Sequence, residues 1–508
     1  MKWIDDFLNK ITMYRLVLYV LAFFLVAAEI FSILKILPYN PLMLLFSVVA
    51  IIIICWLVNF IFARTFNAPT NVESFWITAL ILALIITPPA SLADTGYLWF
   101  IFWAAVWAMA SKYILAIGKK HIFNPAAFGV ALTYLTIGQS ASWWVGTASM
   151  MPLVLIGGFL VVKKIRRFDL VLSFLGSFLL FALILHAKAL AGIPSVLKET
   201  ILNSPMLFFA GIMLTEPLTT PPTRPRRAAY GILTGAIFDP LIHLGGLYST
   251  PELALLFGNL FSYFVSPKKK LILTLKERWD VAKNTIDFGF IPDKKLAFKA
   301  GQYLELTLAH HRPDARGNRR YFTIASAPTD EDIYFGIKFY PEPSSFKQRL
   351  LRMKKGEKLV AGQLAGDFTL PDDVNKKLCF IAGGIGATPY RSMLGLLLAK
   401  KERRDIVMFY SNRRAEDIAY ADTIEEARNE LGVKTVFTLA ELESIPSDWN
   451  GERGFITDEM LKKYMPDWRE RLYYVSGPPS MVDAFKKTLR QMGIHRSHIK
   501  TDFFPGYA

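Results

Sequence analysis

Long apolar runs fill the first half of this 508-residue sequence, between Tyr14 and Val265. A helix that spans a bilayer needs about 20 apolar residues, and the longest runs reach that length. From Lys268 onward, apolar and polar residues alternate as they do in globular proteins. The contrast predicts a polytopic α-helical membrane domain over residues 1–267, followed by globular domains.

The apolar runs predict about ten spans. They cover residues 14–34, 41–62, 73–86, 97–114, 122–137, 150–162, 168–186, 205–214, 228–244 and 251–265. Several runs are short for a full crossing, including those at 150–162 and 205–214. Short runs leave three structures open: helices with little tilt, re-entrant segments, and broken helices that line a site.

Basic residues predict the orientation of this domain. With the N-terminus inside, the cytoplasmic segments hold Lys2, Lys10, Arg64, Lys119, Lys120, Lys163, Lys164, Arg166, Arg167, Arg224, Arg226, Arg227 and Lys268–Lys270. The opposite side has only Lys35, Lys188 and Lys198. The positive-inside rule then predicts a multi-pass protein of the cell (inner) membrane with a cytoplasmic C-terminal module. The net charge of +16 follows mostly from topology, so we expect no nucleic-acid partner. The first residues lack a cleavable signal pattern, so we expect the first span to be retained.

Cysteine usage limits the redox centres that this chain can hold. Its two cysteines, Cys55 and Cys379, lie in an apolar run and in an expected core strand. A [2Fe–2S] cluster usually needs four thiolates, so no ferredoxin-type centre is expected. No disulfide framework and no metal site are expected either.

A run of small residues, 381–389, lies between the apolar stretch 378–380 and the helix-like stretch 390–394. Strand, glycine turn and helix form the geometry in which backbone N–H groups approach a pyrophosphate. The turn contains Gly383, Gly384 and Gly386, followed by Thr388 and Pro389. Flexible surface turns use the same residue types, so this pattern alone is a weak signal.

Strand-like segments precede the turn. One contains Gln302 and Tyr303, and the next, at 319–328, begins with two arginines. Ser344 and Ser345 resemble the start of a helix, and residues 362–368 follow. Any one of these segments is common at the turns and strand ends of a β-barrel. Their order and spacing before the glycine turn are a more specific signal.

Residues 268–508 resemble the ferredoxin–NADP reductase family. The resemblance implies an FAD-binding antiparallel β-barrel over residues 268–372 and an α/β NAD(P)-binding subdomain over residues 373–508. Arg320, Phe322 and Thr323 match the family's arginine-x-aromatic-hydroxyl motif. By resemblance, Arg320 meets the FAD pyrophosphate, Phe322 packs on the flavin, and Thr323 lies near its reactive nitrogen.

Other FAD contacts follow from the same resemblance. Gln302 and Tyr303 are included among them, and Ser344 or Ser345 resembles the phosphate contact at a helix start. The family often has tyrosine at the position of Phe322. Stacking on the flavin is then kept, but a hydrogen bond to the ribityl chain is lost.

In the second subdomain, Gly384, Gly386 and Pro389 match the family's glycine-x-glycine-x-x-proline turn, to which Gly383 is added. Thr388 is then expected beside the nicotinamide. Ser476, Gly477 and Pro478 match its cysteine-glycine-proline motif with serine in place of cysteine. The segment 502–507 resembles the terminal aromatic flap over the flavin, with core packing as the alternative. The implied catalytic residues are Thr323, Ser476 and Phe504.

The choice between NADH and NADPH depends on residues near the adenosine ribose. Arg413 and Asp417 fit a pattern that both cofactor types share, so they do not decide it. Residues 438–443 are acidic and lack an arginine. This composition favours NADH.

Two polar segments interrupt the apolar runs on the expected cytoplasmic side, at 121–129 and 213–224. Proline after a carboxylate, with clustered threonines, can gather free backbone groups and hydroxyls around a cofactor. The expected site residues are Asn124, Glu216, Thr219, Thr220 and Thr223. A tight cytoplasmic turn explains the same residues equally well.

These segments resemble the D-type membrane protein of Rnf-type electron-transport complexes and the B-type membrane protein of the sodium-pumping NADH:quinone reductase. The phenylalanine-asparagine-proline motif, the acidic-proline-threonine motif, the pair Gly157–Gly158 and the span count carry the likeness. Relatives carry FMN on the threonine of a serine/threonine-glycine-alanine-threonine sequence, which this chain lacks. Covalent FMN is therefore not expected, while bound FMN or a quinone is left open.

The sequence thus predicts a membrane flavoprotein oxidoreductase. Electrons would pass from cytosolic NAD(P)H through FAD to a membrane-domain cofactor, a quinone or an acceptor across the membrane, with or without further electron-transport subunits. A haem reductase with two stacked haems needs four histidines, and only His121, His186 and His243 lie near the spans. The alternative that remains is an ion or solute transporter with a flavin redox-sensing module, suggested by Glu216 and Asp239.

Overall fold

The computed structural model describes residues 4, 7–8, 11–66, 72–117, 120–186, 192–266, 270–310, 314 and 317–502. The chain divides into two compact units, Met1–Lys270 and Leu271–Ala508. The division falls close to the boundary at 267 that the hydropathy pattern predicts. The flap residue Phe504 lies outside the described residues.

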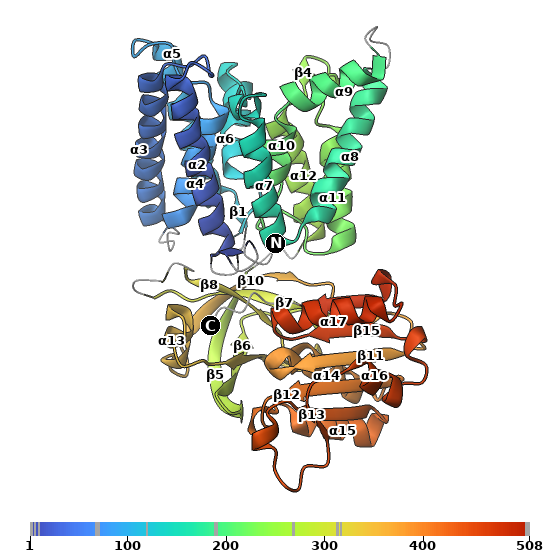
Figure 1. The fold of residues 1–508 in the computed structure, drawn as a ribbon. Coiled ribbons are helices and arrows are strands. Elements are labelled where there is room, and N and C mark those ends of the chain that lie inside the picture. The colour runs from blue at the N-terminus through green and yellow to red at the C-terminus, as the bar shows by residue number, and fades with distance from the viewer. Residues whose placement is uncertain are drawn as a thin grey trace. The chain divides into compact units, whose positions relative to one another are not determined.

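The N-terminal unit is a bundle of helices (Figure 1). The helices are α2 (Met13–Ile33), α3 (Pro41–Thr65), α4 (Val72–Ile85), α5 (Thr95–Ile114), α6 (Pro125–Ile137), α7 (Met151–Ile165), α8 (Phe168–Leu185), α9 (Gly192–Asn203), α10 (Met206–Phe208), α11 (Arg224–Ala236) and α12 (Pro251–Val265). A π-helical turn, η2 (Phe209–Met213), continues α10. Short hairpins pair β1 (Ala116–Ile117) with β2 (Lys120–His121), and β3 (His243–Leu244) with β4 (Leu247–Tyr248).

Every predicted span overlaps a helix, but the count of about ten crossings is not confirmed. Among the described residues, 4 helices are long and apolar enough to cross a membrane: α2, α3, α5 and α8. Shorter apolar helices cover Ser74–Ile85, Pro125–Ile137 and Pro251–Val265. Apolar periodicity located these segments correctly, because it reports burial, but it did not report how far each helix extends.

The unit contains a repeated order of elements. In each half, two helices lead to a short helix, then to a helix, a two-stranded hairpin and a proline-started helix. These are α2, α3, α4, α5, β1–β2 and α6 in the first half, and α7, α8, α10–η2, α11, β3–β4 and α12 in the second, which has the additional helix α9 between α8 and α10. The two hairpins lie at opposite ends of the bundle (Figure 1). This arrangement is typical of an inverted repeat, in which short or broken helices face a site at the repeat interface.

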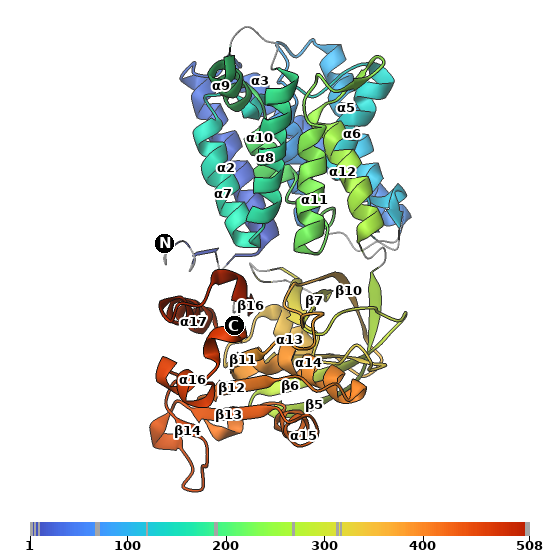
Figure 2. The ribbon, with the colours of Figure 1, turned by 90° about the vertical axis from the view of Figure 1, so that its right-hand side faces the viewer.

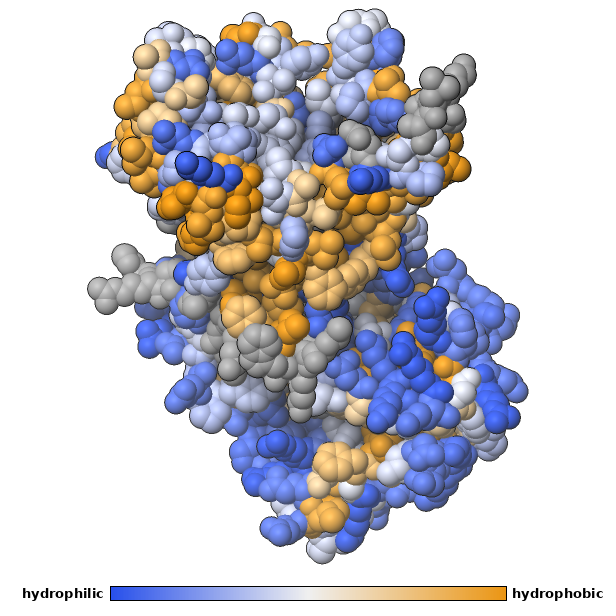
Figure 3. Space-filling view, turned by 45° about the horizontal axis from the view of Figure 1, so that its top comes forward, coloured by the Kyte–Doolittle hydropathy of each residue, from blue (hydrophilic) through white to orange (hydrophobic). Residues whose placement is uncertain are grey.

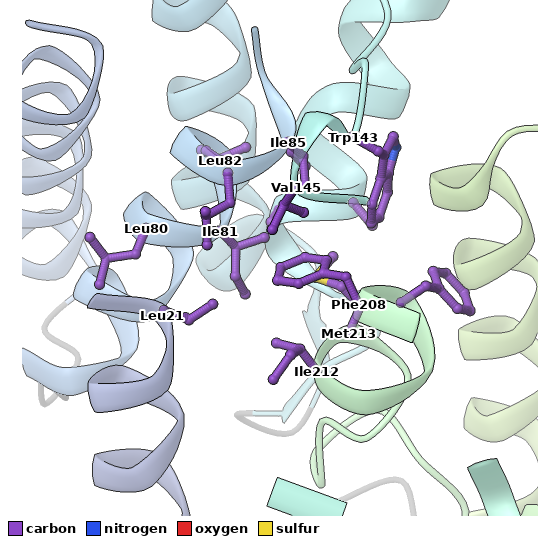
Figure 4. Close-up of a cluster of buried hydrophobic side chains, with 14 of the residues drawn as sticks. Leu21, Leu80, Ile81, Leu82, Ile85, Trp143, Val145, Phe208, Ile212 and Met213 are labelled. Carbon is purple, nitrogen blue, oxygen red and sulfur yellow. The ribbon is translucent and has the colours of Figure 1, made fainter. Parts of the chain in front are cut away.

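Short helices from the two halves meet in the core of this unit. Figure 4 shows side chains of α4 and of the Phe208–Met213 segment converging beside Trp143 and Val145. The Trp144 indole N–H lies 3.0 Å from both the Ala83 and Ile86 carbonyls, which satisfies carbonyls at the buried end of α4. A Cβ on Gly211 would lie 2.8 Å from the Gly158 Cα, so the glycine pair in the sequence motif serves close packing of α7 on η2.

The outer surface of the N-terminal unit is apolar. Figure 3 shows apolar side chains over its flanks, whereas the surface of the C-terminal unit is largely hydrophilic. Leu42 on α3, Leu172 on α8 and Phe264 on α12 are 70%, 64% and 65% exposed. Apolar area of this extent would be unfavourable in water and is suited to lipid.

The C-terminal unit begins with a six-stranded antiparallel sheet in the order β8-β7-β10-β5-β6-β9. Its strands are β5 (Leu271–Ala282), β6 (Thr285–Pro292), β7 (Tyr303–Thr307), β8 (Arg319–Thr323), β9 (Ile333–Lys338) and β10 (Lys358–Ala365). Alternate inward residues, such as Phe288, Phe290 and Phe335, form its core with Phe346 of the short helix α13 (Ser345–Leu351). The predicted antiparallel barrel is confirmed.

A six-stranded parallel sheet follows, in the order β14-β13-β12-β11-β15-β16. Its strands are β11 (Leu378–Gly383), β12 (Ile406–Asn412), β13 (Lys434–Leu439), β14 (Glu452–Arg453), β15 (Leu472–Ser476) and β16 (Ile499–Asp502). Helices α14 (Thr388–Lys400) and α15 (Ala421–Leu431) cover one face, and α16 (Asp458–Tyr464) and α17 (Pro479–Gln491) cover the other (Figure 2). The predicted α/β subdomain is confirmed, and its strand order reverses beside β11, where such sheets bind ligands.

Candidate functional site

Arg320 lies in the middle of β8, where it pairs with Leu306 of β7. Its side chain is 4% exposed, and its guanidinium lies over the Phe346 ring at 5.4 Å from the centroid. The guanidinium donates to the Arg319 carbonyl at 2.7 Å and the Gly317 carbonyl at 3.2 Å. These contacts hold the fork in one orientation, which suits it to a planar, doubly hydrogen-bonded contact with phosphate oxygens.

Asp314 joins Arg320 to the start of α13. One carboxylate oxygen lies 3.4 Å from the Arg320 guanidinium, and the other accepts from the Ser345 N–H at 3.1 Å. The Asp314 N–H donates in turn to the Ser345 hydroxyl at 3.0 Å. The structure therefore brings Arg320 and Ser345 to one anionic group, as binding of a phosphate at this place would require. Spacing in the sequence did not indicate Asp314.

Ser344 and Ser345 have different roles. The Ser344 hydroxyl accepts from the Lys347 N–H and caps α13. The Ser345 hydroxyl instead faces Asp314 and His310, whose ring nitrogen Nε2 lies 3.0 Å away. Of the two serines, Ser345 is the one placed with Arg320.

Thr323 ends β8 and is 6% exposed. Its hydroxyl oxygen is buried and has no hydrogen-bond partner among the described residues. A buried hydroxyl without a partner is unfavourable by about 1–3 kcal/mol. The position therefore fits a group that exchanges a hydrogen bond with a flavin.

The remaining predicted flavin contacts lie around β7 and β8. The Phe322 ring lies 5.9 Å from the Phe346 ring, centroid to centroid, at an interplanar angle of 33°. Phe346, in the barrel core, thus supports the Phe322 ring. Tyr303 pairs with Thr323 across the sheet. The Gln302 side-chain amide donates to the Gly366 carbonyl at 3.2 Å and accepts from the Lys299 N–H at 2.9 Å. The Gln302 side chain thus ties two loops together.

The glycine turn runs from β11 through a short turn, Gly384–Ala387, into α14. Gly384 has a φ of +53°, and a Cβ there would meet nothing within 4 Å. A Cβ on Gly386 would lie 2.5 Å from the Ser476 carbonyl oxygen and 2.7 Å from the Gly477 Cα. A Cβ on Gly383 would collide with Met481 and Pro478. Gly384 is therefore the glycine with an open approach, whereas Gly383 and Gly386 pack against the second motif.

This packing places the two nucleotide motifs side by side. Ser476 is buried and pairs with Ala382 at the end of β11. Pro478 immediately precedes α17, and Pro389 lies in the first turn of α14. The Thr388 hydroxyl donates to the Ile385 carbonyl at 2.7 Å. Both helices thus begin beside the turn, where their N–H groups suit a pyrophosphate.

Charged residues follow β12 and β13 at the same end of the sheet. Arg414 makes a double contact with Glu441, at 3.1 and 2.7 Å. Arg413 contributes its carbonyl, which accepts from the Glu441 N–H at 3.1 Å. Side-chain contacts across two loops are not visible from spacing, so the sequence did not single out Arg414.

In the N-terminal unit, Glu216 is the centre of a polar cluster. Its carboxylate accepts from the Asn124 amide at 2.9 Å and from the Thr219 hydroxyl at 3.3 Å, and lies 3.1 Å from His121 Nε2. The Asn124 N–H donates to Asn259, whose amide donates to the Tyr230 hydroxyl at 2.9 Å. Asn124, Glu216 and Thr219 are brought together as predicted; His121, Asn259 and Tyr230 join them from segments far apart in the sequence.

Two predicted threonines lie apart from Glu216. Thr220 accepts from the Arg167 guanidinium, and its hydroxyl donates to the Pro217 carbonyl at 3.4 Å. Thr223 is the residue before α11, and no hydrogen bond joins its side chain to Glu216 or Asn124 in the described part of the unit. A cavity of about 50 Å³ borders Asn124 and Glu216.

Part of each unit matches a family model. Residues 137–269 match the model for the NQR2, RnfD, RnfE family, and residues 380–487 match the oxidoreductase NAD-binding domain. Both resemblances stated from the motifs are confirmed.

Curated relatives share the reductase character. The xylene/toluene monooxygenase electron transfer component XylA of Pseudomonas putida is 28% identical over 226 residues, which cover 44% of this chain and 62% of that protein. The glycine betaine monooxygenase reductase subunit of Pseudomonas aeruginosa is 27% identical over 239 residues, covering 46% and 63%. The chain thus spans less than two thirds of the length of these relatives.

Solved structures of similar proteins include the cytochrome P450 reductase GcoB of Amycolatopsis. It has 25% sequence identity and a TM-score of 0.42, and covers 47% of this chain and 71% of its own. A ferredoxin–NADP+ reductase from Neisseria gonorrhoeae has 18% identity and a TM-score of 0.40, with 47% and 99% covered.

Proposed function

We propose that this chain is a membrane-bound flavoprotein oxidoreductase. It passes electrons from cytosolic NAD(P)H through FAD to a quinone, a membrane-domain cofactor or an acceptor across the membrane. The observation that carries the proposal is the joining of Arg320 and Ser345 around one anionic group, in a unit that also holds the glycine turn. Residues 137–269 of the other unit match the NQR2, RnfD, RnfE family.

The residues of the C-terminal unit suit the two nucleotides. FAD supplies the chemistry when bound, because it accepts two electrons as a hydride and releases them one at a time. Arg320 and Ser345 would hold its pyrophosphate, Phe322 would pack against its ring, and Thr323 would hydrogen-bond to it. The open face at Gly384 and the N-termini of α14 and α17 would hold the NAD(P)H pyrophosphate. Thr388 and Ser476 would then border the nicotinamide.

NADH is the proposed donor. The Arg414 guanidinium is a cation beside the adenosine end of the sheet; Glu441 contacts it with both carboxylate oxygens, and Glu416 lies 3.6 Å from it. We expect Glu441→Gln to release Arg414 and to raise kcat/KM for NADPH several-fold, with little change for NADH. Glu443→Gln, in the same acidic segment, is the matched control. An unchanged NADPH/NADH ratio in Glu441→Gln would contradict this assignment.

The cofactor content provides the first test. Protein purified from membranes should be yellow, release FAD on denaturation and show no haem Soret band, because the FAD residues are assembled and paired haem ligands were not found in the sequence. FAD is expected at one equivalent for each chain, with a visible spectrum and a flavin count as the measurements. Haem in stoichiometric amount would overturn the proposal.

The route through the membrane unit is tested by separating two activities. Full-length protein in sealed vesicles should reduce ferricyanide directly at the flavin, and a quinone or an enclosed acceptor through the membrane unit. Glu216→Gln removes the charge that His121 and Asn124 contact, so it should slow the second activity and spare the first. Measured rates for both acceptors decide the point.

A matched carboxylate is available as a control. Asp239 makes a similar pair with His186 at 3.2 Å, after the other end of α11. Asp239→Asn should leave both electron-transfer activities unchanged. Equal loss of both activities in Glu216→Gln would indicate a structural role, and unchanged membrane activity would favour the transporter with a redox-sensing flavin module.

A further inference from the structure

Tyr420 connects the nucleotide subdomain to the barrel. It immediately precedes α15 and has a φ of +59°, a left-handed conformation that tyrosine rarely adopts. Its side chain is nevertheless 5% exposed, because it leaves its own subdomain and enters the barrel sheet. Unusual backbone of this kind persists only where the surrounding contacts hold it.

Asp287 and Gly336 of the barrel surround the Tyr420 hydroxyl. The hydroxyl donates to the Asp287 carboxylate of β6 at 2.8 Å, and Asp287 is 1% exposed. Asp287 pairs with Gly336 of β9, and a Cβ on Gly336 would collide with the Tyr420 hydroxyl. The glycine is therefore required because the phenol occupies the place of its side chain.

The loop that ends at Tyr420 follows β12, at the sheet edge that we assign to the adenosine end of NAD(P)H. The barrel holds this loop at two more points. The Lys283 N–H donates to the Glu416 carbonyl at 2.9 Å, and the Lys338 ammonium donates to Asp417 at 2.8 Å. The Lys338–Asp417 pair is mostly buried, with side chains 22% and 14% exposed.

Tyr420 also shares a core with the glycine turn. It belongs to the buried cluster that contains Ala387, at the end of the turn, and Tyr390 of α14. Between them, Thr388 begins α14, and its hydroxyl donates to the Ile385 carbonyl at 2.7 Å. Tyr420 thus contacts the barrel and shares one core with the glycine turn and α14.

We propose that Tyr420 is a positioning residue for NAD(P)H oxidation, which sets the glycine turn and the loop after β12 against the barrel so that the nicotinamide meets the flavin. This inference rests on the proposed function. Tyr420 touches neither nucleotide in this assignment; it acts through the loop after β12 and through the core that it shares with the glycine turn. The sequence of the loop alone, with its shared Arg413 and Asp417 pattern, contains no indication of it.

Asp287 makes this contact sensitive to pH. Burial raises the pKa of Asp287 to about 6, against a smaller lowering by Tyr420 and Arg391 and a raising by Asp422. These groups and Asp280 of β5 line a cavity of about 330 Å³ around the carboxylate. Because the folded pKa is raised, the carboxyl group stabilises the fold when protonated, and that contribution is lost as pH rises towards 6. The ionised carboxylate, however, is the stronger acceptor for Tyr420.

The test uses the full-length protein with Tyr420→Phe, Asp287→Asn and a matched control. Tyr473→Phe is the control, because its buried ring also loses one hydroxyl, which donates to the Trp468 carbonyl at 2.6 Å within the nucleotide subdomain. KM and kcat for NADH with ferricyanide, FAD content and calorimetric affinity for ADP-ribose are measured from pH 5 to 8. ADP-ribose lacks the nicotinamide, so it reports the loop without turnover.

Tyr420→Phe should raise KM for NADH roughly 5- to 20-fold, the change that loss of one hydrogen bond brings. Its FAD content should match the wild type. Wild-type KM should fall as pH rises through about 6. Asp287→Asn keeps only a neutral acceptor oxygen, so its KM at pH 7 should resemble that of the wild type at low pH and should lose this pH step.

One outcome would contradict the positioning role of Tyr420, and another would contradict the proposed function. If Tyr420→Phe matches Tyr473→Phe in KM, ADP-ribose affinity and pH profile, Tyr420 is only a structural residue and the inference fails. If the wild type binds ADP-ribose but does not oxidise NADH or NADPH, the proposed function fails. ADP-ribose affinity of the two tyrosine variants then still decides whether Tyr420 positions the loop.

Discussion

Gly386→Val is expected to reduce NAD(P)H oxidation by roughly 100-fold or more while FAD remains bound, because a displacement of about 1 Å at a reacting centre has an effect of that size. The added side chain cannot fit. Its Cβ would lie 2.5 Å from the Ser476 carbonyl oxygen and 2.7 Å from the Gly477 Cα, so the two nucleotide motifs must separate. Kinetics with ferricyanide, together with extracted flavin for each chain, measure the two effects independently.

Gly384→Ala distinguishes a clash of the added Cβ with the protein from a clash with bound NAD(P)H. A Cβ at Gly384 meets no protein atom within 4 Å, so only the positive φ is unfavourable, by about 1–2 kcal/mol. A large rise in KM for NAD(P)H with a small loss of thermal stability would place the nucleotide at this face. Gly395→Ala, within α14, is the control and should not lower activity, since a Cβ there makes only an ordinary 3.4 Å contact with Ala327. Normal kinetics in both Gly384→Ala and Gly386→Val would exclude the turn as a nucleotide site.

Arg320→Ala is expected to release FAD. The variant loses a charged, fork-shaped donor set, worth about 1.5–3 kcal/mol, which corresponds to roughly 10- to 150-fold weaker binding. Flavin content after gel filtration, and activity recovered by titration with FAD, measure the loss. Arg320→Lys keeps the charge but not the fork, so we expect an intermediate result.

A control distinguishes FAD loss from damage to the barrel, because Arg320 also lies over the Phe346 ring. Arg278→Ala removes an arginine on β5 that donates to the Leu351 carbonyl and should leave FAD in place. Full FAD occupancy in Arg320→Ala, with flavin lost from Gly386→Val instead, would mean that the two subdomains are assigned in reverse.

The position of Asp314 leads to a further prediction about FAD affinity. The Asp314 carboxylate now lies between the Arg320 guanidinium and the Ser345 N–H, where the pyrophosphate is assigned. A bound pyrophosphate and this carboxylate would repel each other. Neutral Asp314→Asn is therefore expected to change FAD affinity in the opposite direction to Arg320→Ala.

Local chemistry in the sequence predicted the elements and the cofactor motifs of this protein. Apolar runs located the helices because burial in lipid or core leaves a continuous signal. Strand, glycines and proline located the turn at Gly384–Pro389, because a close backbone approach excludes a Cβ at particular positions. Arg320 and Thr323 were likewise identified from neighbouring residues on a single strand.

Tertiary structure decided which of these residues meet, and how. The contacts of Asp314 with Ser345, of Gly386 with Ser476, of Asn124 with Asn259 and of Tyr420 with Asp287 each join segments that lie apart in the sequence. Separation along the chain does not determine distance in space, so motif spacing could not distinguish Ser345 from Ser344. The number of helices that cross the membrane could not be predicted from the sequence for the same reason, because helix length depends on caps and breaks that neighbouring helices supply.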